Sequence, residues 1–193
     1  MFGALKYHAR RVFDFSGRDA RQTFWYWFLL VFIVNLAVGI AMSVPMMGSG
    51  MATALAGARD GDPQAAQAAM MAEMASYMRP LMLGGIVLGL FNLVLMAAPF
   101  VRRLHDSGKS GIWAAIAGLI YLASLWLSWS NADQIVAMTQ QMAVATPSER
   151  IAMQAEMARQ SLLGYIPLIM VIVFGVLKSD PGPNRFGEEP VRF

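Results

Sequence analysis

Four long apolar stretches alternate with polar segments along the chain. None of the four contains Asp, Glu, Lys, Arg or His, and they cover residues about 24–44, 81–101, 112–129 and 161–177. A helix of about 20 residues rises about 30 Å, which matches the hydrocarbon core of a bilayer. The pattern therefore predicts an all-α integral membrane protein with four transmembrane helices.

Two of the connecting segments, residues 46–80 and 130–160, are long enough to form helices of their own. Asp62 precedes a proline and then a run rich in Ala, Gln and Met, and Thr146 stands three residues before Glu149. Both arrangements are typical of helix N-termini. Methionines recur at helical spacing in these segments, so we expect two amphipathic helical loops outside the membrane, on the extracytoplasmic side.

Other local signals predict where helices begin and end. Pro45 should end the first span, and Ser16, with Asp19 three residues later, predicts a helix that starts at Gly17. The indole-rich start of the first span, which includes Trp25 and Trp27, is typical of an aromatic belt at the headgroup level. With the spans above, these signals predict a single membrane domain over residues 1–193.

Composition supports the membrane assignment and excludes several kinds of chemistry. Hydrophobic residues make up 57% of the chain and charged residues only 14%, whereas a soluble domain has about 25% charged residues. There is no cysteine, which excludes disulfides, thiolate metal ligands and cysteine nucleophiles. With only two histidines, a zinc site is not expected. We expect no metal, no cofactor and no nucleic-acid partner.

The basic residues predict the orientation of the chain. Four spans would place both termini and the segment 102–111 on one side of the membrane. Eleven of the 15 Lys and Arg residues lie on that side, in residues 1–23, 102–111 and 178–193. The positive-inside rule then predicts cytoplasmic termini. No cleavable signal pattern precedes the first span, and the Pro- and Gly-rich tail, 178–193, should fold back on the helices.

The densest polar segment, residues 102–111, reads RRLHDSGKSG and joins the second and third spans. Gly108 suits the left-handed backbone that ends a helix, and Ser110 is a suitable cap for the next one. The Gly-Lys-Ser sequence is not a phosphate-binding loop, because that motif requires a glycine where Arg103 stands. The segment is therefore predicted to be a short charged connection between two helices.

Three polar segments carry a recognisable pattern. They read FSGRDARQTFW (15–25), RRLHDSGKSG (102–111) and GPNRFG (182–187). Together they resemble the small bacterial inner-membrane proteins called domain of unknown function 805. The resemblance implies a bacterial inner-membrane location and no established activity. The long Met- and Ala-rich outer loops depart from the typical pattern, as does Ile112, where an aromatic residue is more usual.

We expect one ordered cytoplasmic cluster from these segments, because the loop is short and the tail is stiff. Its predicted members are Arg18, Arg21, Arg102, Arg103, His105, Asp106 and Asn184. In one interpretation Asp106 pairs with an arginine, and the other arginines bind anionic lipid headgroups or a protein partner. In the other, the arginines only enforce topology. The leading hypothesis for function is a non-enzymatic membrane scaffold or interaction protein.

Other functions stay open at this stage. His105 and Asp106 could act as an acid–base pair in a membrane enzyme, and the methionine stripes could bind Cu(I) or only pack. A transporter for a small solute or a lipid is the main alternative, although spans without ionisable residues argue against ion coupling. A homo-oligomer is compatible with the sequence. Asn35 and Asn92 lie at similar depth, and we expect their amides to pair.

Overall fold

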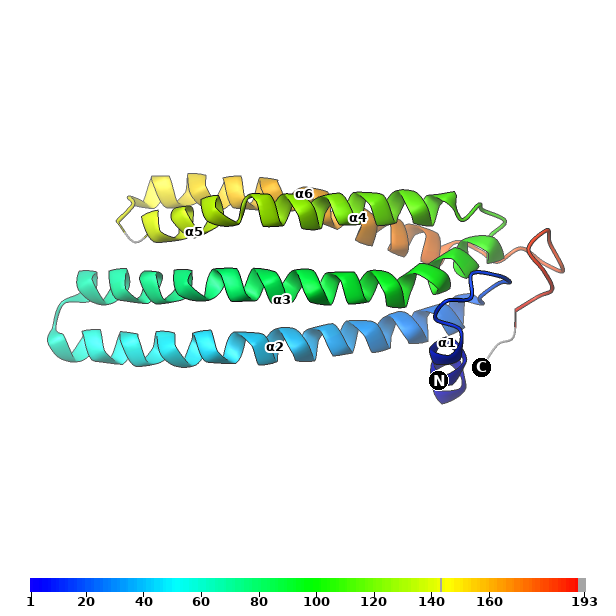
Figure 1. Cartoon of the computed structure of the whole chain (residues 1–193), viewed down its shortest axis with the longest axis horizontal. Coiled ribbons are helices and arrows are strands. Elements are labelled where there is room, and N and C mark those ends of the chain that lie inside the picture. Colours follow the sequence, from blue (N-terminus) through cyan, green and yellow to red (C-terminus); the bar gives the residue numbers. More distant parts are fainter. Residues whose placement is uncertain (143, 191–193) are drawn as a thin grey trace. The chain divides into compact units, whose positions relative to one another are not determined.

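The computed structural model describes residues 1–142 and 144–190, which form an all-α fold without a β-strand (Figure 1). In chain order the helices are α1 (Phe2–Arg10), α2 (Arg21–Asp60), α3 (Pro63–Asp106), α4 (Ile112–Ser130), α5 (Ala132–Gln141) and α6 (Pro147–Val176). The predicted fold class is confirmed. Residue 143 of the predicted loop 130–160 and residues 191–193 of the predicted tail lie outside the described residues.

Helices α2, α3, α4 and α6 are long and apolar enough to cross a membrane. Only 11% of the most apolar 18-residue window of each helix is buried within the protein. Large side chains such as Phe32 and Leu119 are 55% and 67% exposed. A soluble protein rarely exposes continuous apolar surface of this extent. The chain is therefore a multi-pass membrane protein.

The helices continue well beyond the predicted spans. Helix α2 has 40 residues and so rises about 60 Å, about twice the thickness of the hydrocarbon core. Pro45, which was predicted to end the first span, does not end the helix, because it lies inside α2. Seven of the 15 residues that follow it in α2 are Ala or Met, which are good helix formers. Hydroxyl groups nearby also bond to main-chain carbonyls, including that of Ser49 to Met46 O at 3.2 Å.

The helix that was predicted to start at Gly17 does not form. Gly17 has a positive φ of 82° in a bend, and α2 begins four residues later at Arg21. Asp19 is not a capping residue, because its carboxylate bonds to Arg102 instead. The local signal was overridden by a long-range ion pair.

The other predicted helix ends are confirmed. Gly108 adopts the left-handed backbone, with φ 68°, and Ser110 Oγ accepts the Ile112 N–H at 3.3 Å. Asp62 Oδ1 accepts two N–H groups of the first turn of α3. Thr146 and Glu149 form a reciprocal capping box at the start of α6.

The chain forms two compact units. The first comprises Met1–Leu36, Leu88–Ser124 and Leu163–Phe193, and the second comprises Ala37–Val87 and Leu125–Leu162. The core of the first unit consists of Phe24, Phe100, Leu104 and Ala117, with the partly buried Trp25 and Phe174 packed against it. In the second unit α2 and α3 approach so closely that a Cβ on Gly57 would overlap Ala66.

Trp27 is buried and does not face the lipid as the predicted aromatic belt requires, and Trp25 also has a partner within the protein. Trp27 is only 5% exposed and donates its indole N–H to Leu95 O at 3.0 Å. Trp25 is partly buried and donates to Gly175 O at 3.2 Å. Both indoles therefore join helices within the first unit, because each N–H finds a carbonyl there.

Candidate functional site

Three segments of the first unit meet at one end of its helices. They are the linker between α1 and α2, the last turn of α3 with the loop that follows, and the tail after α6. Five charged side chains at this junction are each at most 4% exposed, and we call them the arginine cluster: Arg18, Asp19, Arg102, Arg103 and Asp106. Buried charges of this kind require both counter-ions and hydrogen bonds.

Asp106 lies at the centre of the arginine cluster. Its Oδ1 accepts from Arg18 Nη2 at 3.1 Å and from Arg18 Nε at 3.3 Å. Its Oδ2 accepts from Arg103 Nη1 and from Ser179 Oγ, the latter at 2.5 Å. The main-chain carbonyl of Asp106 accepts the N–H of Asp180 at 2.8 Å. This carboxylate therefore joins the linker, α3 and the tail.

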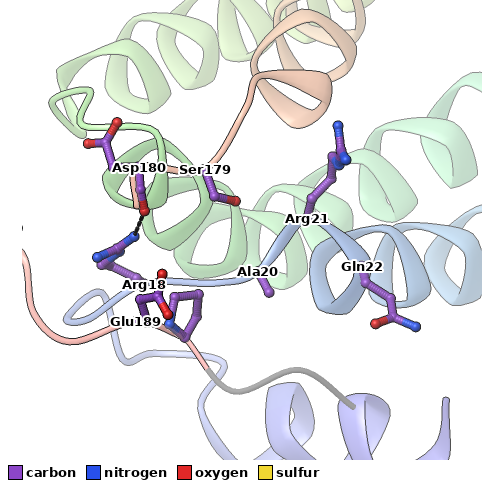
Figure 2. Close-up of a pocket in the computed structure, with 8 residues that line it drawn as sticks. Arg18, Ala20, Arg21, Gln22, Ser179, Asp180 and Glu189 are labelled. Carbon is purple, nitrogen blue, oxygen red and sulfur yellow. Dashed lines mark hydrogen bonds between the residues drawn. The ribbon is translucent and has the colours of Figure 1, made fainter. Parts of the chain in front are cut away.

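Arg18 holds the tail through main-chain carbonyls as well as through Asp106. Its Nη2 donates to Asp180 O at 2.7 Å (Figure 2), and its Nη1 donates to Gly182 O at 2.6 Å. Each donor thus faces an acceptor from a segment far away in sequence. The Pro- and Gly-rich tail is ordered by these bonds although residues 178–190 contain no helix, as predicted.

Arg103 completes the C-terminal end of α6. The last carbonyls of a helix have no partner within the helix, and Arg103 donates from Nε to Gly175 O at 3.1 Å and from Nη2 to Leu177 O. Trp25 donates to the same Gly175 carbonyl. The end of α6 is therefore capped by side chains of α3 and α2.

Arg102 ties α1 and the linker to α3. Its Nε donates to Asp19 Oδ2 at 2.9 Å, and its Nη1 donates to Arg11 O at 2.9 Å. Its Nη2 lies 2.9 Å from His8 Nδ1, while His8 Nε2 lies 3.3 Å from Thr23 O. A neutral imidazole with its proton on Nε2 satisfies both contacts, because the guanidinium can only donate.

Burial shifts the pKa values of His8 and Asp19 in opposite directions. Burial, followed by the charge of Arg102, lowers the pKa of His8 from 6.5 to about 4. The stability contributed by neutral His8 is therefore complete above pH 6.5 and is lost as the pH falls toward 4. Burial outweighs Arg102 at Asp19 and raises its pKa from 3.8 to about 6. Protonation of Asp19 therefore stabilises the folded protein as the pH falls from about 6 toward 3.8.

His105 and Asn184 anchor the tail on the outer side of the arginine cluster. The ring of His105 stacks on Phe186, with centroids 3.9 Å apart, and its Nδ1 lies 3.2 Å from Gly17 O. Asn184 Nδ2 donates to His105 O at 3.0 Å. His105 and Asp106 turn to different partners, so the geometry gives no support to an acid–base pair.

The structure brings together six of the seven predicted site residues. The seventh, Arg21, lies at the edge of the arginine cluster, where it is exposed and its Nη1 is 3.5 Å from Val176 O. The buried arginines are not left for an anion, because their donors already face aspartates and carbonyls. The side chains that sequence reasoning missed are His8, Asp19, Ser179 and Asp180.

A family model described as "Protein of unknown function (DUF805)" matches residues 12–188. The chain belongs to this family. The match includes all three segments that build the arginine cluster, and it confirms the resemblance seen in the sequence. No curated protein and no solved structure matches the chain.

This DUF805 protein also has a small polar pocket of about 200 Å³ beside the arginine cluster. Figure 2 shows Arg21 and Gln22 at the start of α2, with Asp180 and Glu189 of the tail on the other side. Glu189 Oε1 accepts the N–H of Gly182 at 3.0 Å. The pocket combines both signs of charge, and Arg21 is its exposed cation.

Proposed function

We propose that the protein is a non-enzymatic scaffold of the bacterial inner membrane whose exposed basic side chains bind anionic lipid headgroups on the cytoplasmic side. The observation that carries this proposal is that the arginine cluster is buried and bonded within the protein. It acts as a rigid support, while Arg21, Lys109 and Lys178 remain exposed around it. Each of these three residues stands at or next to the end of a long apolar helix.

The charge of the two units supports the cytoplasmic orientation. The unit with the arginine cluster contains eleven Lys and Arg residues and six Asp and Glu residues. The other unit contains four basic and six acidic residues. Basic residues near span ends are retained in the cytoplasm, and each one near an anionic surface contributes about 1 kcal/mol to lipid attraction.

Cysteine labelling in intact cells tests the orientation, since the chain has no cysteine of its own. Lys109→Cys should be protected from a membrane-impermeant thiol reagent, and Ser130→Cys should react. Both positions are exposed within the protein, so protection at Lys109 reports the membrane barrier. Labelling of Lys109→Cys with protection of Ser130→Cys would reverse the proposed orientation.

Thermal unfolding with added lipid tests the headgroup contact. Phosphatidylglycerol should raise the Tm of the detergent-solubilised protein more than phosphatidylcholine does. The triple variant Arg21→Gln, Lys109→Gln, Lys178→Gln should lose most of this difference. A matched triple variant in the other unit, Arg59→Gln, Arg79→Gln, Arg159→Gln, removes equal charge and should keep it. An equal lipid response in all three proteins would reject the headgroup proposal.

A further inference from the structure

An apolar cavity lies between the four long helices of the first unit, apart from the arginine cluster. Its volume is about 770 Å³, which is within the range of about 300–1,000 Å³ found for ligand pockets. Each helix contributes one stripe at helical spacing. The stripe of α3 includes Asn92, Met96 and Phe100, and that of α4 includes Ala114 and Tyr121. The side chains of these inward stripes leave a space between the helices rather than packing against one another.

Small residues keep the cavity open on its α4 side. Ala114, Ala117 and Gly118 follow one another along the inward stripe. A Cβ on Gly118 would lie 3.6 Å from Leu93 Cδ1, which is ordinary contact. A larger side chain at this position would therefore be accepted by the backbone and would extend into the cavity.

The two amide side chains of the wall pair with each other. Asn35 Nδ2 donates to Asn92 Oδ1 at 2.9 Å, and Asn92 Nδ2 donates to Asn35 Oδ1 at 2.6 Å. Nearly all the other lining side chains are apolar. Apolar cavities of this kind stay free of water, so the wall favours a hydrocarbon occupant over a polar solute.

The rim of the cavity faces the lipid. Phe32, Leu119 and Leu168 line it and are 55%, 67% and 43% exposed, whereas Phe100 and Ala117 in its floor are buried. From Gly111, just before α4, the lining extends along α4 to Leu122, a rise of about 16 Å. Its Gly111 end is two residues from the exposed Lys109. The cavity thus runs from the headgroup level into the hydrocarbon core.

We infer that this cavity holds one acyl chain of a membrane phospholipid. The helices around it cross a bilayer, so acyl chains are the apolar molecules present at its rim. The extent of its lining from Gly111 to Leu122 fits a chain that enters from the headgroup level. This site is independent of the headgroup contact proposed above, because it recognises hydrocarbon and involves none of the basic residues.

Photo-crosslinking in vesicles tests the inference. The full-length protein is reconstituted in phosphatidylcholine that contains a small fraction of the same lipid with a diazirine at the end of one acyl chain. Labelled residues are then mapped by mass spectrometry. Met96 and Tyr121, which line the cavity, should be labelled along with the outward-facing Val94 and Ile116. Labelling confined to the outward-facing residues would overturn the inference.

Variants with a leucine side chain in the cavity test the same inference, and a leucine on the outer side of α4 is their control. Gly118→Leu and Ala114→Leu should each reduce labelling of Met96 severalfold and leave Val94 unchanged. Ala123→Leu, on the exposed side of the same helix, should not reduce either. Unchanged Met96 labelling in a folded Gly118→Leu or Ala114→Leu variant would also overturn the inference. Phosphatidylcholine is zwitterionic, so this result does not depend on whether anionic headgroups bind.

Discussion

Replacing Asp106 by alanine removes the carboxylate that joins the three segments of the arginine cluster. Arg18 and Arg103 then keep their positive charges in a buried position, with no anion between them. Ser179 also loses its acceptor. Both arginines retain their bonds to main-chain carbonyls, which prevents them from simply leaving the site. The main consequence of Asp106→Ala is therefore a pair of uncompensated buried cations.

The structure sets the size of the expected effect. Removing one partner of a fully buried ion pair costs about 3–5 kcal/mol, and the Asp106 side chain and its two arginine partners are 0% exposed. For a chain of this length each kcal/mol lowers the Tm by about 2–4 °C. A decrease of about 6–20 °C is therefore expected for Asp106→Ala. Asp106→Asn should also destabilise, because its amide N–H₂ would face donors.

Thermal unfolding in detergent measures this decrease, and the chain offers a matched control. Asp133→Ala breaks an arginine–aspartate pair whose side chains are 64% and 80% exposed. Such exposed pairs contribute at most about 1 kcal/mol. Lys109→Ala removes an exposed charge and should change stability by no more than about 0.5 kcal/mol. If Asp106→Ala unfolds at the same temperature as these two variants, the arginine cluster does not stabilise the fold.

Three further outcomes follow from contacts described above. His8→Gln removes a buried imidazole whose protonation favours unfolding. As the pH falls from 6.5 toward 4, this variant should therefore gain stability relative to the unmodified protein, by up to about 3 kcal/mol. A Tm difference that is constant with pH would contradict the burial of neutral His8. A double-mutant cycle with Asn35→Leu and Asn92→Leu should give a coupling free energy of about 0.6 kcal/mol, as for other hydrogen bonds between membrane helices. If the two losses of stability simply add, the amide pair contributes nothing. Gly175→Ala should lower stability by about 1–3 kcal/mol, because its Cβ would lie 2.9 Å from Trp25 and 3.0 Å from Phe24; Gly85→Ala, where no atom lies within 4 Å, should not.

The sequence was sufficient for features that depend on local or bulk properties. Spans follow from runs of apolar residues, and the caps at Asp62, Ser110 and Thr146 follow from side chains that bond within one turn. The pairing of Asn35 with Asn92 was also predictable, because an amide in hydrocarbon needs a polar partner at the same depth. In each case the partner lies nearby in the sequence, or the membrane limits the possible partners to polar groups at the same depth.

The failures at Asp19 and Trp27 occurred where a distant partner decides the outcome. Asp19 has the spacing of a capping residue, but its carboxylate accepts a hydrogen bond from the buried Arg102 instead. Trp27 is the type of residue that is common at the membrane–water interface, but a carbonyl of α3 accepts its indole N–H. The three arginines Arg18, Arg102 and Arg103 have more N–H donors than Asp106 alone can accept. This excess of donors over acceptors in the predicted cluster was the signal in the sequence that could have identified Asp19 and the tail carbonyls.

The capping of α6 by Arg103 and Trp25 has a consequence for synthesis of the protein. The donors belong to α2 and α3, while the acceptors at Gly175 and Leu177 come later in the chain and are synthesised after them. Until these carbonyls are made, the Nε and Nη2 groups of Arg103 lack their acceptors, and only its bond to Asp106 can form. A product that stops before residue 175 therefore keeps two guanidinium donors of Arg103 without their carbonyl acceptors, although its Nη1 can still donate to Asp106.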